Sequence, residues 1–419
     1  MPTREATPLS ERETAADRVG SSTIRDLLRL AERPEVLSLA GGLPDVGLID
    51  AGRFRAALDA AAGTHGPNGP VGLQYGPTAG LRELRHVVGR QLDVPVDDVV
   101  ITTGSQQGLD LIARACCAPG DVVVVQRPAY VGAIQAFRSA GATLRSVAGD
   151  DQGMVVEELA SLLDSGISPA AIYVVADHHN PSGAVLSSDR RMQLRALARD
   201  HGILIVEDAA YRDLHWGPPT NPIFSPGESM VHLGSSSKVL APGLRVGWMT
   251  GPADVLDRVT RLKQSADLHT PTWNQLVVAH LLSDGHHAAH LERLRCEYRR
   301  RSLALHGALV AHLGERARIA LPDGGMFLWL RSTDGTDLQR VLDRALRGAG
   351  PGPAHGGGGG ERTGVAFVPG SAFVVPGEAV PVDDADHPDR TARLSFALHR
   401  PDRLVDAAER LSRAWTMLD

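Results

Sequence analysis

Between residues 98 and 251 the sequence alternates short, continuously apolar runs with stretches of mostly helical periodicity. Continuous apolarity is typical of strands covered on both faces, as in a parallel sheet flanked by helices. The region therefore predicts an α/β unit built on a mainly parallel sheet. The expected strands are DVVIT (98–102), DVVVVQ (121–126), AAIYVVA (170–176), GILIVED (202–208), SMVHLGS (229–235) and RVGWMTG (245–251).

The rest of the chain predicts a second, smaller α+β unit, which the length of 419 residues also favours. Residues 252–315 have a helical pattern, and 292–313 predict one long helix that leads to this unit. The first twenty residues are polar and aperiodic, so we expect them to be mobile, with a helix beginning at Ser21. Short strand-like pieces occur at 324–330, 364–370 and 392–398.

Charge and composition favour a cytoplasmic enzyme or binding protein. A net charge of −6 argues against a broad nucleic-acid footprint and against a polybasic membrane surface. No apolar run approaches the roughly 18 residues of a membrane span, and the N-terminus has no hydrophobic signal core. Three cysteines are too few for a disulfide framework and fit a reducing compartment.

Polar side chains follow several of the expected strands at their carboxyl ends, where ligands bind in such sheets. A glycine-flanked turn, TGSQQGLD, opens a helix after the first strand, so the backbone N–H groups around Ser105 and Gln106 can hold a phosphate. Asn180 follows the third strand, Asp208 ends the fourth, and Tyr211 lies three residues further on. We therefore expect a binding site at this edge.

Lysine is rare here: Lys238 and Lys263 are the only two lysines among 43 Lys and Arg residues. Because positive charges are arginine by default in this chain, a lysine at a strand end favours a role as a deprotonated amine, which guanidinium cannot fill. Lys238 lies in GSSSKVLAPGLR, beside Ser235 and Ser237 and shortly before Arg245. Lys263 has no comparable neighbours, and we interpret it as codon bias.

Together these residues meet the requirements of an aldehyde cofactor that bonds to a lysine. A nearby cation and a desolvated pocket favour the neutral amine of Lys238. A buried carboxylate such as Asp208 keeps a pyridine nitrogen protonated, so that the ring accepts electrons. Asn180 and Tyr211 suit a phenolic oxygen. Hydroxyls and a guanidinium that suit a phosphate come from Ser105, Ser235, Ser237 and Arg245.

The combined pattern resembles the fold-type I pyridoxal-phosphate (PLP) enzymes of the class I/II aminotransferases, in the branch of the 2-aminoadipate and kynurenine aminotransferases. The resemblance runs from about Ser21 to the C-terminus. The segments that carry it are SLAGGLPD (38–45), LQYGPTAGLRELR (73–85), TTGSQQGLDL (102–111), RPAYVGAI (127–134), HNPSG (179–183), VEDAAYRDL (206–214), SSSKVLAPGLRVGW (235–248) and ARLSF (392–396).

The resemblance implies a mainly parallel seven-stranded sheet in a large PLP-binding domain, residues 51–295, and a small α+β domain, residues 296–419. Residues 21–50 would pack with the small domain and cover the substrate. It also implies a homodimer with shared active sites. The reaction would be ping-pong transamination between an L-amino acid and a 2-oxo acid.

The resemblance also implies a role for each matching residue. Lys238 would form the internal aldimine, Asp208 would pair with the pyridinium nitrogen, and Tyr130 would stack on the ring. Asn180 and Tyr211 would bond the phenolic oxygen. The phosphate would be held by Ser105, Gln106, Ser235, Ser237 and Arg245, with Tyr75 from the neighbouring subunit. The substrate α-carboxylate would be bound by Arg393, assisted by Gly42 and Asn180.

Other readings stay open at this point. The same fold supports decarboxylases, lyases and amino-acid oxidases or hydroxylase-deaminases, and a non-catalytic PLP-binding regulator is a further alternative. A plain nucleotide-binding protein is disfavoured because neither G-x-G-x-x-G nor a Walker pattern occurs. In HHAAH, His286 and His290 have a zinc-compatible spacing but no obvious third ligand, so we expect no metal site. The Gly-rich stretch 351–364 predicts a flexible loop.

Overall fold

The computed structural model describes residues 14–19, 35–67, 69–347, 364–381 and 387–418. The helix expected from residue 21 and the Gly-rich stretch up to residue 363 lie outside these ranges. Within the first twenty residues, Ala15–Val19 form the short helix α1.

The main sheet has eight strands in the order β4–β11–β10–β9–β8–β5–β6–β7. Pairing is parallel from β10 through β9, β8 and β5 to β6. β11 pairs antiparallel with both of its neighbours, and the two-residue strand β7 pairs antiparallel with β6. The bounds are β4 Val99–Thr102, β5 Val122–Arg127, β6 Thr143–Asp150, β7 Gly153–Met154, β8 Ala171–Val174, β9 Leu204–Asp208, β10 Met230–Ser235 and β11 Gly247–Thr250.

Helices cover both faces of this sheet. Successive side chains of a strand point to opposite faces, so a continuously apolar strand has an apolar side chain on each face to bury. In β5, Val123 and Val125 join the core formed with α5 (Ser105–Cys116), α6 (Val131–Ser139) and α9 (Ala253–Ala266). Val124 joins a separate core with α7 (Val156–Asp164) and α8 (Ser188–His201). The predicted mainly parallel, doubly covered sheet is confirmed. Five of the six predicted runs contain one of its strands, and the run 121–126 matches β5 except for its last residue, Arg127.

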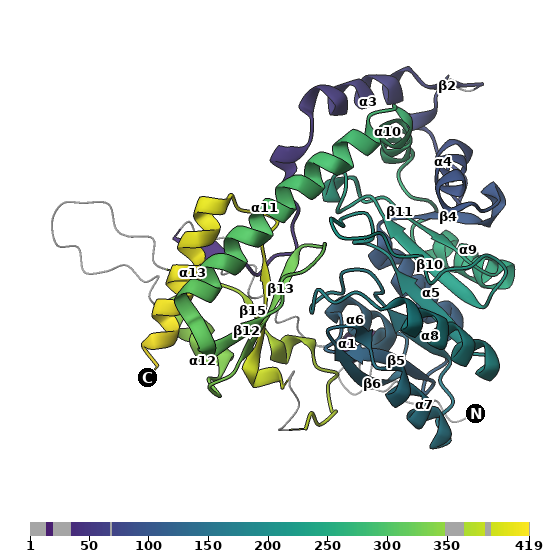
Figure 1. Cartoon of the computed structure of the whole chain (residues 1–419). Coiled ribbons are helices and arrows are strands. Elements are labelled where there is room, and N and C mark those ends of the chain that lie inside the picture. Colours follow the sequence, from purple (N-terminus) through teal and green to yellow (C-terminus); the bar gives the residue numbers. More distant parts are fainter. Residues whose placement is uncertain (1–13, 20–34, 68, 348–363, 382–386, 419) are drawn as a thin grey trace, which may run out of the picture.

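A second, antiparallel sheet has the order β12–β13–β16–β15. It packs with α11 and α12, and α13 packs in turn on these two helices. The long helix α11 runs from α10 to this unit (Figure 1). The predicted strand pieces and the predicted long helix fall in this part of the chain. The bounds are α10 Thr272–Ser283, α11 His287–Leu313, α12 Leu338–Arg347, α13 Pro401–Thr416, β12 Ala317–Ile319, β13 Phe327–Ser332, β15 Val368–Pro369 and β16 Thr391–Ser395.

The N-terminal part of the chain reaches both units. β1 (Val36–Ser38) pairs in parallel with β14 (Gly364–Ala366), whereas α3 (Ala51–Gly63) and α4 (Arg82–Leu92) pack on α10. The hairpin β2 (His65–Gly66) and β3 (Gly69–Pro70) lies between those two helices in sequence.

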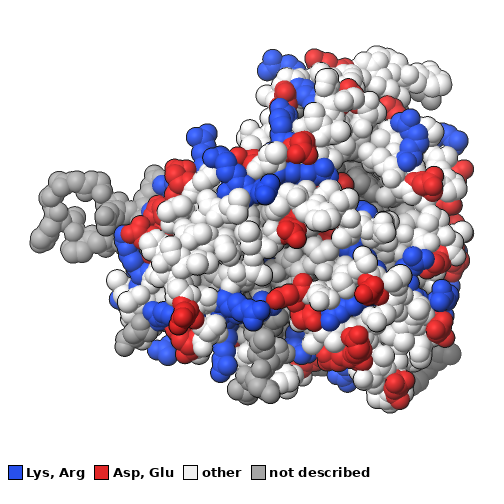
Figure 2. All heavy atoms as spheres, in the orientation of Figure 1, with Lys and Arg blue, Asp and Glu red and all other residues white. Residues whose placement is uncertain are grey.

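On the face drawn in Figure 2, acidic and basic side chains are interspersed and neither sign forms a continuous field. Among the described helices, none combines the length and the apolar character needed to cross a membrane.

Candidate active site

A cavity of about 300 Å³ lies at the carboxyl ends of the parallel strands. Ligand sites in doubly wound sheets form at this edge. The lining residues are Ser105, Gln106, Tyr130, Val175, Asn180, Asp208, Ala210, Tyr211, Ser235, Ser237, Lys238 and Arg245. Ten of these twelve are residues that the sequence predicts for the site.

Lys238 lies in the turn after β10, where its side chain is partly buried. Its Nζ donates a hydrogen bond to the carbonyl oxygen of Gly42, at 3.0 Å. Burial lowers the pKa of Lys238 to about 8, and the charges of Arg393 and Arg245 act in the same direction, while Asp208 opposes them. A substantial fraction of this amine is therefore neutral near physiological pH.

Asp208 is the last residue of β9 and is only 6% exposed. Oδ2 accepts a hydrogen bond from the Tyr173 hydroxyl at 2.9 Å, and Oδ1 accepts one from the Ala210 N–H at 3.2 Å. Burial raises the pKa of this carboxyl, against the lowering effect of these hydrogen bonds. A cationic partner in the cavity would stabilise the ionised form.

Five residues form a polar end of the cavity around the start of α5. Helix α5 begins after Gly104, which supplies no side-chain cap, so the first N–H groups remain available to a ligand. Arg245 donates to the backbone carbonyls of Thr103 and Pro242, and no carboxylate pairs with it within the described ranges. The five residues are Ser105, Gln106, Ser235, Ser237 and Arg245.

Asn180 connects Arg393 with Tyr211. Arg393 Nη1 donates to Asn180 Oδ1 at 2.7 Å, and Asn180 Nδ2 donates to the Tyr211 hydroxyl at 3.1 Å. The Arg393 guanidinium also lies 4.4 Å from the Phe327 ring centre and 5.2 Å from that of Phe373. Its Nη2 donates to the Ala40 carbonyl oxygen at 2.6 Å, and its buried Nε has no hydrogen-bond partner among the described residues.

Three other predicted residues have distinct placements. Tyr130 lines the cavity and donates to Gln106 Oε1 at 3.2 Å. Gly42 touches the site through its carbonyl, and a Cβ there would lie 3.0 Å from the Phe327 ring. Tyr75 lies outside the cavity lining and is 78% exposed.

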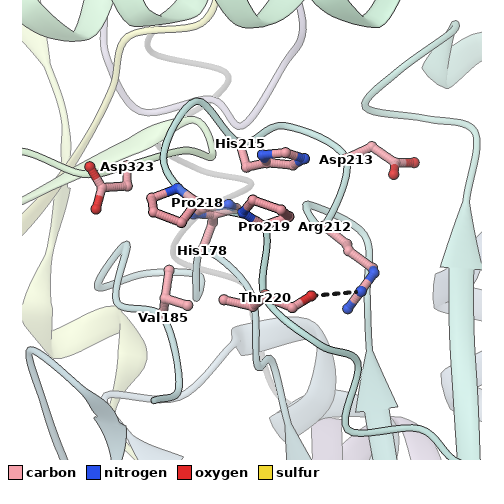
Figure 3. Close-up of a pocket in the computed structure, with 9 residues that line it drawn as sticks. All are labelled: His178, Val185, Arg212, Asp213, His215, Pro218, Pro219, Thr220 and Asp323. Atoms are coloured by element: carbon pink, nitrogen blue, oxygen red, sulfur yellow. Dashed lines mark hydrogen bonds between the residues drawn. The ribbon is translucent and has the colours of Figure 1, made fainter. Parts of the chain in front are cut away.

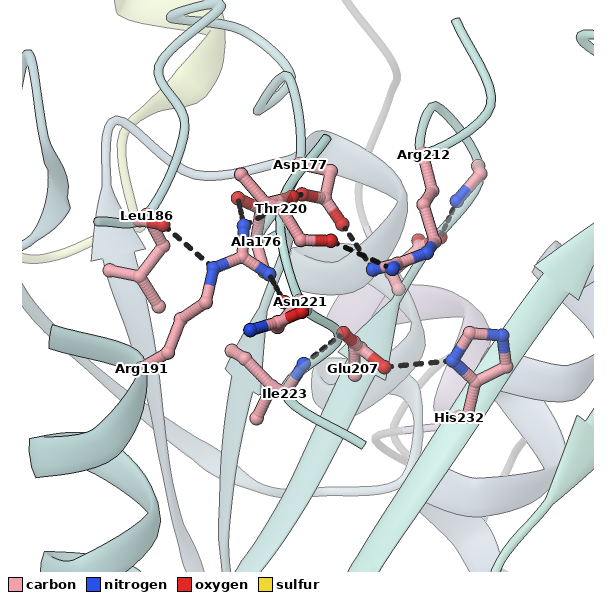
Figure 4. Close-up of polar contacts among 12 residues, drawn as sticks. Ala176, Asp177, Leu186, Arg191, Glu207, Arg212, Thr220, Asn221, Ile223 and His232 are labelled. Carbon is pink, nitrogen blue, oxygen red and sulfur yellow. Dashed lines mark hydrogen bonds and ion pairs between the residues drawn. The ribbon is translucent and has the colours of Figure 1, made fainter. Parts of the chain in front are cut away.

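Buried polar contacts hold the turn that carries Asn180 (Figure 4). Asp177 accepts hydrogen bonds from Arg191 at 2.6 Å, Arg212 at 3.1 Å and Thr220 at 2.6 Å. Although burial opposes it, these donors hold the pKa of Asp177 below its ordinary value. A second buried pair joins Glu207, the residue before Asp208, to His232, with 2.7 Å between Glu207 Oε2 and His232 Nδ1.

His178 belongs to the same turn but faces a different cavity, of about 440 Å³ (Figure 3). Its backbone has φ +52°, and a Cβ on Gly324 would overlap its ring. Burial lowers the pKa of His178 to about 4, so the ring is neutral. His179 is buried and bonds to Ser182. These placements agree with a role of both histidines in building the turn.

Sequence reasoning missed Tyr173, Val175 and Ala210. Tyr173 lies inside the predicted strand 170–176, and a phenol in an otherwise apolar strand is a signal that its hydroxyl needs a buried partner.

His290, from the HHAAH segment, makes a 2.7 Å contact through Nε2 with the Val239 carbonyl. Among the described residues there is no group of three or more His, Cys, Asp or Glu that could hold a metal.

The chemistry of this lining fits PLP. The uncapped start of α5 suits a phosphate, as does Arg245, which has no carboxylate partner among the described residues. The buried carboxyl of Asp208 suits a protonated ring nitrogen. Lys238 supplies an amine with a lowered pKa in the same cavity.

Known proteins have the same organisation. The family model "Aminotransferase class I and II" matches residues 49–411. The chain is 36% identical to a 2-aminoadipate transaminase of Thermus thermophilus, over 97% of this chain and 98% of that protein. It is 32% identical to aromatic-amino-acid aminotransferase 1 of Thermococcus litoralis, over 94% and 91%.

A crystal structure of a Pyrococcus horikoshii kynurenine aminotransferase, in complex with PMP, superposes with a TM-score of 0.86 at 32% identity, covering 98% of each chain. The chain therefore belongs to the class I and II aminotransferases, a family of PLP-dependent enzymes that act on amino acids.

Proposed function

We propose that this aminotransferase carries out ping-pong transfer of an amino group from an L-amino acid to a 2-oxo acid with Lys238 as its central catalytic residue. The observation that carries the proposal is a lysine with a pKa lowered to about 8 in one cavity with a buried carboxyl and a polar end that includes Arg245. When bound, PLP supplies an aldehyde that bonds to amines and a ring that takes up the electron pair released at the substrate Cα.

Lys238 acts as the proton carrier in this proposal. Its Nζ would take the proton from the substrate Cα as general base and, as general acid, would return it to the aldehyde carbon of the cofactor, to which the transferred nitrogen is bonded. Asp208 holds the ring nitrogen protonated, and Tyr173 holds Asp208 in place. Tyr130 stacks on the ring.

Separate groups of residues would bind the cofactor and the substrate. Asn180 and Tyr211, already hydrogen-bonded to each other, contact the phenolic oxygen. Arg393 does not line the cavity but is hydrogen-bonded to Asn180, which does. It would bind the substrate α-carboxylate with Asn180 and Gly42, and its Nε, which has no partner among the described residues, supports an anion there. The phosphate is held by Ser105, Gln106, Ser235, Ser237 and Arg245.

A single-turnover experiment tests the reaction class. Mixing the holoenzyme with an L-amino acid alone should convert the cofactor to its amine form, and a 2-oxo acid should then restore the aldehyde absorbance. An oxidase, decarboxylase or lyase would not be reset by the 2-oxo acid. Lys238→Ala and Lys238→Arg should each abolish the first step, because neither variant supplies a neutral amine.

The substrate side chain is left to a donor panel. Relatives named for 2-aminoadipate and for aromatic amino acids make these the first donors to test, with 2-oxoglutarate and pyruvate as acceptors.

We also propose a homodimer with shared sites. Tyr75 and Leu73 are each 78% exposed, and Leu268 is 42% exposed, which is unusual for large apolar side chains. Tyr75 stacks edge-on against His269, with ring centres 5.7 Å apart. In this proposal Tyr75 reaches the phosphate in the partner subunit.

The proposed division is a large domain at 51–295 and a small domain at 296–419, with 21–50 on the small domain. The main sheet lies between residues 99 and 250 and the antiparallel sheet between 317 and 395, while β1–β14 pairing ties the N-terminal segment to the second unit.

We further propose a cytoplasmic location, which the three free cysteines support.

A further inference from the structure

The second lysine of the chain has a structural setting of its own. Lys263 lies on α9 with its side chain fully buried, at 0% exposure. Its Nζ donates to Gln107 Oε1 at 3.0 Å and to the two carboxylate oxygens of Asp267 at 2.9 and 3.0 Å. All three acceptors converge on one nitrogen, so the interpretation of Lys263 as codon bias does not account for its placement.

The same acceptors also hold the turn between β4 and α5. Gln107 Oε1 accepts from the Thr103 N–H at 2.7 Å, and Asp267 Oδ2 accepts from the Thr103 hydroxyl at 2.9 Å. Gln107 Nε2 donates to Asp267 Oδ2 at 2.6 Å. Thr103 is thus bound through both its backbone and its side chain to a cluster centred on the buried Lys263.

Thr103 in turn contacts the phosphate end of the cavity. Its carbonyl accepts from Arg245 Nη2 at 3.3 Å, and Gly104 and Ser105 follow it directly at the start of α5. A shift of Thr103 would therefore move the helix N-terminus and the arginine together.

We propose that Lys263, Gln107 and Asp267 form a brace that fixes Thr103, so that the start of α5 and Arg245 converge on the cofactor phosphate. Lys263 is a positioning residue in this account, since it lines no part of the cavity. The inference rests on the proposed function only in taking this end of the cavity as the phosphate site.

The brace also explains why a lysine stands at this position in an arginine-rich chain. An ammonium group presents three donors around one atom, which matches three convergent acceptors. A planar guanidinium spreads its donors over a wider fork and would overpack a side-chain site with no exposure. Methionine keeps the apolar stem but leaves Gln107 and Asp267 without their donor.

The test compares binding of PLP with binding of pyridoxal, which lacks the phosphate. Wild type, Lys263→Met and Lys263→Arg are stripped of cofactor and titrated with each compound by absorbance, and release of PLP from each holoenzyme into a trap is timed. Gln264→Met, an exposed neighbour on the same helix, is the matched control.

Both Lys263 variants should lose about tenfold or more in PLP affinity, with less than about a twofold change for pyridoxal, so the ratio of the two falls. Gln264→Met should leave the ratio unchanged. An unchanged ratio in the Lys263 variants, or an equal loss for both compounds, would overturn the brace.

If the Lys263 variants fail to fold, Thr103→Val replaces them, because it removes the hydroxyl that donates to Asp267 and also contacts the Thr270 hydroxyl, and it leaves Lys263 in place. The PLP-to-pyridoxal ratio should then fall in that variant, and an unchanged ratio counts against the proposal. Wild-type protein that binds neither compound would overturn the proposed function itself, a result distinct from a normal wild type with insensitive variants.

Discussion

The ionisation of Asp208 depends on the groups around it. Burial raises its pKa, and the Tyr173 hydroxyl is the first of the groups that counter this effect. Tyr173→Phe removes that donor, so the carboxyl should hold the ring nitrogen less well. We expect kcat to fall by about tenfold with a smaller change in the KM of the amino donor, measured by steady-state kinetics.

Tyr298→Phe is the matched control, because Tyr298 is another buried tyrosine and lies away from the cavity. Among the described residues its hydroxyl has one hydrogen-bond partner, the Asp45 N–H. It should leave kcat within about twofold of wild type. If Tyr173→Phe instead keeps the wild-type kcat, the hydroxyl does not tune Asp208.

Lys238 gives the site a pH dependence of definite sign. Its pKa is lowered from 10.5 to about 8, and only the neutral amine bonds to an aldehyde. The rate at which cofactor-free protein captures PLP should rise with pH and level off above about pH 8. Stopped-flow absorbance checks this, and a rate still climbing steeply at pH 10 would contradict the lowered pKa.

At the residue scale, the sequence predicts the cavity lining well because those side chains stand where strands end. Asp208 and Asn180 are fixed by one local event, the end of a parallel strand. Tyr173 and Lys263 are different, since their roles depend on partners 35 and 156 residues away. A local pattern carries no information about such contacts.

The turn between β4 and α5 is the element most sensitive to added bulk. Gly104 has φ +76°, and a Cβ there would lie 2.5 Å from Arg245 Nη2. Gly104→Ala should displace the guanidinium and weaken PLP binding by about tenfold or more, measured by absorbance titration.

Gly120→Ala separates this clash from backbone strain. Gly120 has φ +92°, but a Cβ there meets nothing within 4 Å. Both variants carry the cost of a left-handed alanine, of order 1 kcal/mol, so both should unfold more easily. Equal PLP affinity in the two variants would show that the Arg245 contact is unimportant.

At the element scale, the strands that the sequence misses are those without continuous apolarity. β6 is half exposed, with buried and exposed positions mixed along its length, because only β7 follows it at the edge of the sheet. The antiparallel direction of β11 was also not predicted, since an apolar run looks the same in either direction. Its run was found because both of its faces are covered.

Across the whole molecule, the proposed dimer makes each site depend on two chains. Lys238→Ala and Tyr75→Ala are each expected to be poorly active alone. A mixed dimer would contain one site with both Lys238 and a partner Tyr75, so mixing the variants and allowing exchange should restore part of the wild-type activity. Mixtures no more active than the separate variants would place Tyr75 outside the partner site.

The arrangement of the two units is the level least accessible from sequence. Pairing of β1 with β14 joins segments more than three hundred residues apart. β1 is too short to give a clear strand signal, and the strand piece predicted at 364–370 gives no sign of its partner. The long helix α11 was predictable because its periodicity is local, but the helices that it would contact were not.

Identifying the amine that bonds to PLP is the most direct test of the role of Lys238. Borohydride reduction of the holoenzyme, followed by peptide mapping with mass spectrometry, should place the pyridoxyl group on the peptide that contains Lys238. The buried Lys263 should remain unlabelled. Label on Lys263 or the N-terminal amine, or protein that stays colourless with added PLP, would contradict the central claim.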